Sequence, residues 1–158
     1  MRKEIIGSLD ESDSRAGHDS YLDPESLARV EITSEEFGHP IESALTTRPG
    51  PGWLAAQPGE QIIRLRFDEP QWLQRILLVF DEPDRARTQE FVLRWSSDGG
   101  QSYREIVRQQ YNFAPPGTIQ EVEQYDVNLA GVTALELWVV PDISGGDARA
   151  SLAMLRLG

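Results

Sequence analysis

The chain has 158 residues and a mass of 17.8 kDa, which is enough for one sizeable hydrophobic core but not for two ordinary domains. Its formal net charge of -11 and isoelectric point near 4.6 would repel phosphate groups and anionic lipids, so neither nucleic acid nor a membrane is an expected partner. The absence of cysteine excludes disulfides, thiolate metal sites and cysteine nucleophiles.

The N-terminal residues 1–22 are rich in Ser, Asp, Glu and Gly and show little periodicity, which predicts a mobile arm. No signal-peptide core follows the basic start, and no apolar run approaches the roughly 20 residues that span a membrane, so we expect a cytoplasmic protein. The arm's apolar pair, Ile5 and Ile6, could still dock on a sheet edge. Residues 23–158 are expected to form a single domain.

The domain begins with a helix signal and continues with strand signals. Asp23 is an N-cap type residue before Pro24, which predicts one helical turn. Apolar residues then alternate with polar ones, as they do in β-strands. The expected strands are residues 29–34, 61–67, 72–80, 90–95, 103–108, 119–127, 134–140 and 151–157. About eight strands at this spacing predict an all-β fold, an antiparallel β-sandwich or jelly roll.

The connections between these strands differ in length. The long ones are residues 35–60, 81–89, 109–118 and 141–150. If successive strands run antiparallel, these four connections all lie at the same end of the sandwich, and the short ones lie at the other end. Loops on a rigid scaffold commonly form ligand sites. The loop-rich end is therefore the expected binding surface.

The polar stretch WSSDGGQSY, residues 95–103, is expected to be a structural hairpin and not a site. Adjacent glycines permit positive φ angles in a tight turn, and the Asp98 carboxylate can accept backbone N–H bonds. The spacing also resembles the Asp-box, a folded hairpin motif. A calcium loop of the EF-hand type needs several carboxylates, and this stretch has one. The expected structural turn residues are Ser96, Asp98, Gly99 and Gly100.

Four segments together resemble the discoidin, or coagulation factor V/VIII type C, family. They are ESALTTRPGPGW, PQWLQRILLVF, FVLRWSSDGGQSYREI, and LELWVV followed by SLAMLRLG. The resemblance runs from about residue 28 to the end of the chain and implies a galactose-binding-like sandwich. Members of that family bind sugars, phospholipids or proteins through loops at one end. Leu45-Thr46 and Met154 replace residues that help hold the family's calcium, so no metal or other cofactor is expected.

Sugar recognition needs an aromatic face for the ring and planar charged or amide groups for the hydroxyls. Trp53, after the turn at residues 49–52, could supply the face, and Arg48 the paired donors. Trp53 and Phe113 could equally be core residues, and the arginines could be solvated or paired with nearby aspartates. The candidate ligand-binding residues at the loop-rich end are Arg48, Trp53, Arg85, Arg87, Tyr111, Phe113, Asp142, Asp147 and Arg149.

Catalysis has little support in the sequence. The two histidines, His18 and His39, have no partners at metal-ligand spacing, and no G-x-S-x-G motif is present. Adjacent carboxylates such as Glu35 and Glu36 arise by chance among 26 acidic residues. The sequence therefore favours a non-catalytic module that binds a saccharide.

The alternative function is an intracellular protein-interaction domain that docks into a larger complex. Its contact surface could be the same loops or the face around Trp138. Alternation turns Leu135, Leu137 and Val139 inward and leaves the Trp138 indole outward. An exposed indole of this kind predicts cover by the N-terminal arm, by a partner chain or by a second copy in a homodimer.

Overall fold

The computed structural model of the chain describes residues 21–158. The expected arm therefore lies outside the described residues except for Tyr21 and Leu22, and so does any docking by Ile5 and Ile6. Leu22 N donates to Leu157 O at 2.6 Å, and the Arg75 guanidinium lies 4.6 Å from the centre of the Tyr21 ring. These two residues belong to the folded sandwich.

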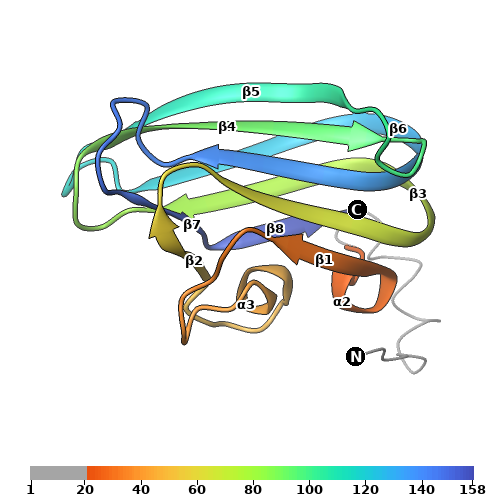
Figure 1. Cartoon of the computed structure of the whole chain (residues 1–158), viewed down its shortest axis with the longest axis horizontal. Coiled ribbons are helices and arrows are strands. Elements are labelled where there is room, and N and C mark those ends of the chain that lie inside the picture. The colour runs from red at the N-terminus through yellow and green to blue at the C-terminus, as the bar shows by residue number, and fades with distance from the viewer. Residues whose placement is uncertain (1–20) are drawn as a thin grey trace.

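The described residues form antiparallel strands and two short helices (Figure 1). In chain order the elements are α2 (Pro24–Leu27), β1 (Ala28–Ile32), α3 (Glu42–Leu45), β2 (Trp53–Pro58), β3 (Gln61–Asp81), β4 (Arg87–Ser96), β5 (Arg104–Phe113), β6 (Gln120–Val140), β7 (Arg149–Leu152) and β8 (Met154–Leu157). The helical turn expected after Asp23 is α2, and the Asp23 carboxylate accepts a hydrogen bond from Glu25 N at 3.2 Å.

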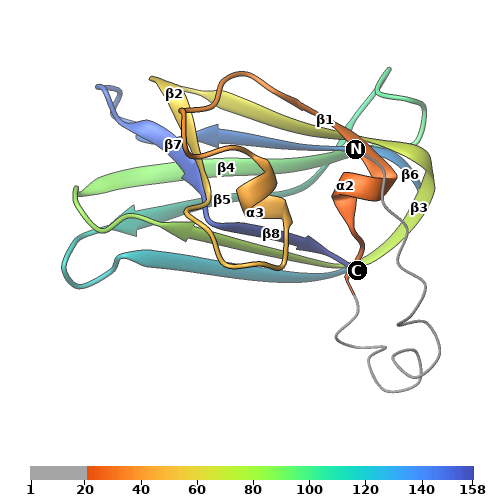
Figure 2. The same cartoon turned by 90° about the horizontal axis from the view of Figure 1, so that it is seen from below.

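Two layers make up the sandwich, and β3 and β6 each pass from one layer to the other. The first half of β3 pairs with β1 and with the last part of β6, which pairs in turn with β4 and then β5. We call this the five-stranded layer. The second half of β3 pairs with β8 and with the first part of β6, which forms the three-stranded layer (Figures 1 and 2). The register shifts between Arg66 and Arg75, where the paired strands bend.

The hydrophobic core lies between these layers. Phe80 of the three-stranded layer and Phe91 of the five-stranded layer bring their ring centroids to 5.2 Å. Both side chains are fully buried, and so are Ile63 and Leu65, which the sequence placed on one face. Burying a side chain of this size contributes about 1.5–3 kcal/mol. The all-β antiparallel sandwich expected from alternation is confirmed.

Several expected strand boundaries were wrong. The segments 61–67 and 72–80 are one continuous strand, because the chain bends through Pro70 without leaving the β3–β6 pairing. Residues 119–127 and 134–140 likewise form the single strand β6. The expected last strand is two, β7 and β8, which pair with different partners on either side of Ala153. The strand β2 lies within an expected loop.

Three of the four long connections meet at one end of the sandwich, and the hairpin expected between two strands lies at the other, whereas the other two expected short connections are parts of the continuous strands β3 and β6. At the loop-rich end, Glu82 N donates to Ile119 O at 2.8 Å and Ile143 N donates to Thr88 O at 2.9 Å, so three of the loops contact one another or a strand end there. The hairpin after β4 lies at the other end, where Gly99 N donates to Thr133 Oγ1 at 2.9 Å. Figure 1 shows the two ends on opposite sides of the molecule.

The hairpin at residues 97–103 is closed by hydrogen bonds among the turn residues that the sequence singled out. The Asp98 carboxylate accepts hydrogen bonds from Ser102 N at 2.9 Å and from Ser96 Oγ at 2.7 Å. Ser96 Oγ accepts one from Gly100 N, and Gly99 and Gly100 have φ angles of 75° and 90°. Hydrogen bonds from Ser102 and Ser96 hold the pKa of Asp98 far below its usual range. The likeness to the Asp-box stays a prediction.

Trp138 is less exposed than its outward position suggested. Its Nε1 donates to Glu136 Oε1 at 2.8 Å, and the Arg94 guanidinium lies 5.1 Å from the ring centre. The indole is half-buried because these neighbours on the sheet surface cover it. Cover by the N-terminal arm concerns residues outside the described part of the chain, and cover by a partner chain or a second copy stays a prediction.

Candidate functional site

The loop-rich end is held together from inside by Arg87. Its guanidinium donates to Glu82 Oε1 at 2.7 Å and to Pro141 O at 2.7 Å, and lies 4.8 Å from the Phe113 ring centre. These contacts join the loop before β4, the loop after β6 and the end of β5. The Arg87 side chain is 1% exposed, so it organises the loops and does not itself reach solvent.

Both aromatic side chains proposed for this end are core residues. Trp53 is 1% exposed, and its indole Nε1 donates to Ser34 O at 3.0 Å. Phe113 is 2% exposed and packs edge-on against Tyr111 with ring centroids 5.0 Å apart. Tyr111 itself is half-buried, with its hydroxyl donating to Gln120 O at 2.9 Å. Neither Trp53 nor Phe113 can offer a ring face to a ligand, so the ligand-facing alternative was wrong for these two.

The remaining loop residues lie at the surface, and most are paired locally. Arg85 donates to Asp147 Oδ1 at 2.9 Å, which links the loop before β4 to the loop before β7. The hydrogen bond and charge of Arg85 lower the pKa of Asp147. Asp142 accepts a hydrogen bond from Ser144 N at 3.0 Å and so stabilises its own turn. Arg149 donates to Glu36 Oε1 at 2.8 Å.

Arg48 lies apart from the other candidates. It lines a cavity beside α2 together with Tyr21, Leu22 and Arg156. None of the other candidates lines this cavity, and the buried Trp53 cannot present its ring to a ligand beside Arg48, so the expected pairing of Arg48 with Trp53 was wrong.

A different aromatic residue, Phe37, is presented to solvent. It is 98% exposed, the most exposed of the large apolar side chains in residues 21–158. His39 N donates to Glu36 O at 2.9 Å, and Gly38 has a φ angle of 86°, which defines a tight turn with Phe37 in its second position. Glu36 N donates to Leu54 O at 2.8 Å, which attaches the turn to β2. Phe37 therefore projects from a fixed backbone.

Polar groups adjoin this turn. The Glu36 carboxylate accepts from Arg149 Nη1, and the same nitrogen donates to Ala55 O at 3.3 Å. The two charged side chains are about 40% exposed, so each keeps donor or acceptor capacity toward solvent. We call Glu36, Phe37, His39 and Arg149 the Phe37 surface. The sequence did carry a signal for it, since Phe37 precedes a glycine within an otherwise polar loop.

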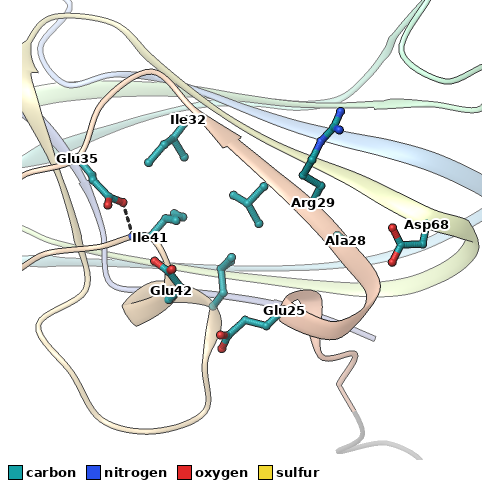
Figure 3. Close-up of a pocket in the computed structure, with 10 residues that line it drawn as sticks. Glu25, Ala28, Arg29, Ile32, Glu35, Ile41, Glu42 and Asp68 are labelled. Carbon is teal, nitrogen blue, oxygen red and sulfur yellow. Dashed lines mark hydrogen bonds between the residues drawn. The ribbon is translucent and has the colours of Figure 1, made fainter. Parts of the chain in front are cut away.

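A groove lies along β1, which is an edge strand of the sheet formed by residues 21–158 (Figure 3). It has a volume of about 630 Å³. Val30, Ile32 and Ile41 give it apolar walls. Glu35, on its margin, accepts a hydrogen bond from Ile41 N at 3.0 Å, so this carboxylate supports the loop. Residues of α2 and α3 line the groove together with residues of β1, so the two short helices form part of its wall.

A buried carboxyl lies inside the loop-rich end. Glu121 is 1% exposed and accepts a hydrogen bond from Gln89 Nε2 at 3.2 Å, while its Oε2 has no partner in residues 21–158. Burial, with the neighbouring Glu123, raises the pKa of Glu121 to about 8. Its burial keeps it from acting as an acid or base on a bound ligand.

Within residues 21–158, no group of three or more His, Cys, Asp or Glu side chains is placed to hold a metal ion. No helix in this part of the chain is long and apolar enough to cross a membrane.

The same fold occurs in solved carbohydrate-binding modules. The family 32 module of NanJ from Clostridium perfringens, solved with galactose, is 13% identical with a TM-score of 0.62, over 87% of this chain and 97% of that one. A family 32 module from a family 31 glycoside hydrolase of Clostridium perfringens is 16% identical with a TM-score of 0.62, over 91% and 97%. A pectin-binding module is 15% identical with a TM-score of 0.59, over 88% and 92%.

Similarity at the level of sequence is weaker. No protein-family model matches the sequence, and neither does any curated protein. The likeness to the solved modules spans nearly their whole length, so it covers both layers and the loops of this chain. The chain therefore has the discoidin-type, galactose-binding-like β-sandwich fold of these family 32 modules, as the sequence resemblance implied.

Proposed function

We propose that the protein is a non-catalytic module that binds a saccharide at the Phe37 surface. The observation that carries the proposal is the almost complete exposure of Phe37 on a turn fixed by three backbone hydrogen bonds, among them Leu54 N to His39 O. A ring this exposed buries almost no apolar surface, so it contributes little to folding stability. A fixed ring presents the same face to each ligand and loses little entropy on binding.

The chemistry of the Phe37 surface suits a sugar. The ring can pack against the C–H face of a pyranose. Arg149 adds N–H donors, and Glu36 adds acceptor oxygens for hydroxyl groups. Their mutual ion pair holds both side chains in place before the ligand arrives. The surface is small and open, which favours the end or side group of a glycan over a deeply enclosed ligand.

The comparisons support this proposal through the fold. The similar modules include one solved with galactose and one that binds pectin, as their names state. The loop-rich end, where the Phe37 surface lies beside β2 and β7, is also where the sequence predicted a binding surface.

The proposal is tested by titrating the protein with galactose, N-acetylgalactosamine and pectin oligosaccharides, monitored by NMR. We expect shift changes centred on residues 36–39 and on Arg149, and loss of binding in Phe37→Ala. Trp72→Ala is the matched control, because Trp72 is 60% exposed but lies at the bend far from the loops. Equal saccharide affinity in the Phe37→Ala and unmodified proteins would place the site elsewhere.

A further inference from the structure

Arg156 is a buried cation that has no anionic partner among the described residues. It is 8% exposed, and within residues 21–158 its guanidinium makes long hydrogen bonds alone, from Nη1 to Leu155 O at 3.3 Å and to Ala44 O at 3.5 Å. No carboxylate of residues 21–158 forms an ion pair with it. The chain has 26 acidic residues against 15 basic ones, so a partner was readily available.

An unpaired buried charge is costly, because the protein interior does not replace its hydration. Burial lowers the pKa of the Arg156 guanidinium, and the group that raises it is Tyr21, not a carboxylate. Other buried arginine side chains here are compensated: Arg87, for example, donates to Glu82 at 2.7 Å. Arg156 is therefore an exception that folding alone does not explain.

The position of Arg156 gives it access to a cavity. Alternation along β8 turns Leu155 and Leu157 into the core and Arg156 to the opposite side, toward α3. There it lines a cavity of about 310 Å³, at the lower end of the range for small-molecule sites. The cavity lies where α2, the segment after α3 and β8 meet.

Arg48, Thr46 and Thr47 line the same cavity. The Arg48 side chain is exposed and has no ion pair in the described part of the chain, so its guanidinium is available to a ligand. One buried and one exposed arginine therefore line the same cavity together with two threonines.

We infer that this cavity binds the oxyanion group of a small molecule, a carboxylate or a phosphate, through Arg156 and Arg48. A planar guanidinium donates two parallel N–H bonds to either group, and such charge-assisted bonds are roughly twice as strong as neutral ones. The low dielectric around Arg156 strengthens the attraction further. The anionic ligand would supply the negative charge that Arg156 lacks among the described residues.

The other wall of the cavity shapes the rest of the ligand. Asp23 and Glu25 line it from α2, and the Asp23 carboxylate already accepts the Glu25 N–H. Carboxylates repel a bare anion but accept hydrogen bonds from hydroxyl groups. The arrangement therefore favours a polyhydroxylated acid, with its anionic group toward Arg156 and its hydroxyls toward α2. The volume limits it to about one sugar ring.

The experiment is a calorimetric titration at low salt with three ligands that share one ring size: glucuronate, glucose 6-phosphate and glucose. We expect at least one of the two anions to bind and glucose not to bind. Binding of glucuronate would identify a carboxylate as the recognised group, and binding of glucose 6-phosphate would identify a phosphate. Affinity should fall as salt is added, because the contact is ionic. Anions that bind no better than glucose would overturn the inference.

Arg156→Met and Arg48→Met locate the site. Met fills similar space without charge, so in Arg156→Met we expect binding to weaken by about tenfold or more and the melting temperature to rise, because an uncompensated buried cation is removed. Arg48→Met should weaken binding without changing the melting temperature. A fall in the melting temperature of Arg156→Met with unchanged anion affinity would show that Arg156 has only a structural role.

This site is independent of the Phe37 surface. Phe37→Ala should leave anion binding unchanged, and Arg156→Met should leave the binding of neutral saccharides unchanged. The two proposals can therefore fail separately. Anion affinity lost in Phe37→Ala would mean that the anion binds at the loop-rich end, and the inference would be wrong.

Discussion

Arg94 donates a hydrogen bond of 2.7 Å to the carboxylate of Glu136, which is 1% exposed although it lies on the outer face of the five-stranded layer. Glu136 also pairs with Arg64 on the neighbouring strand, and Arg64 pairs with Glu31. Charges of opposite sign thus alternate across β1, β3, β6 and β4. Cross-strand pairs of this kind stabilise a sheet and fix its register.

The first prediction concerns this row. Glu136→Gln leaves Arg64 and Arg94 without their carboxylate, so we expect it to lower the free energy of unfolding by roughly 3 kcal/mol. Urea denaturation measures the effect. Glu105→Gln on β5 is the control, because its pair with Arg108 is exposed and should be worth less than about 1 kcal/mol. Equal effects of the two substitutions would contradict the importance of burial.

The second prediction is a pH dependence from Glu121. Its folded-state pKa of about 8 lies above its unfolded value, so the folded protein holds this proton more tightly. The stabilising contribution is complete below the unfolded pKa near 4.5 and is lost as the pH rises toward 8. Glu121→Gln removes the penalty, so its unfolding free energy relative to the unmodified protein should increase between pH 5 and pH 8.5. A difference that does not vary with pH would rule out this titration.

The third prediction concerns the hairpin at residues 97–103. Asp98→Ala removes the acceptor for Ser102 N and Ser96 Oγ, so the melting temperature should fall and the Ser102 amide should exchange faster with solvent. Because the pKa of Asp98 is lowered, its contribution should persist at neutral pH and disappear only in strong acid. The NMR signals of the Phe37 surface should not move; shifts there would mean that the two ends are coupled.

The fourth prediction separates buried from exposed ion pairs at the loop-rich end. Arg87→Met leaves Glu82 without its partner and frees Pro141 O, so we expect a loss of about 2–4 kcal/mol and altered signals in residues 82–86 and 141–148. Arg85→Met breaks the exposed contact with Asp147 and should leave the unfolding curve nearly unchanged. Thermal and urea unfolding of both variants provide the comparison.

The sequence predicted the fold class and the loop-rich end because both depend on local patterns. The alternation of Ile63, Leu65 and Phe67 with polar residues shows which face of the strand is buried, and this pattern does not depend on which strand pairs with it. The merging of two expected strands into β3 was not visible, because Pro70 and its polar neighbours resemble a loop. Only the continued pairing of β3 with β6 shows that the chain stays extended there.

The site was harder to predict because it depends on distant contacts. The Trp53 indole faces the core, where it donates a hydrogen bond to Ser34 O, and Ser34 lies 19 positions earlier in the sequence. The Glu36–Arg149 pair joins residues 113 positions apart. No local pattern encodes such a pair, whereas the exposure of Phe37 follows partly from the glycine beside it.

The two long strands have a consequence for how the molecule unfolds. Because β3 and β6 each run through both layers, neither layer can open without displacing backbone that is hydrogen-bonded in the other. The sandwich should therefore unfold as one cooperative unit. Within residues 21–158, the strand partner of β1 is in the five-stranded layer and that of β8 is in the three-stranded layer. Amide protons of both strands should nevertheless report the same opening free energy wherever exchange requires global unfolding. A ligand bound at the Phe37 surface or in the Arg156 cavity then stabilises the whole domain, so a single melting curve can register occupancy of either site.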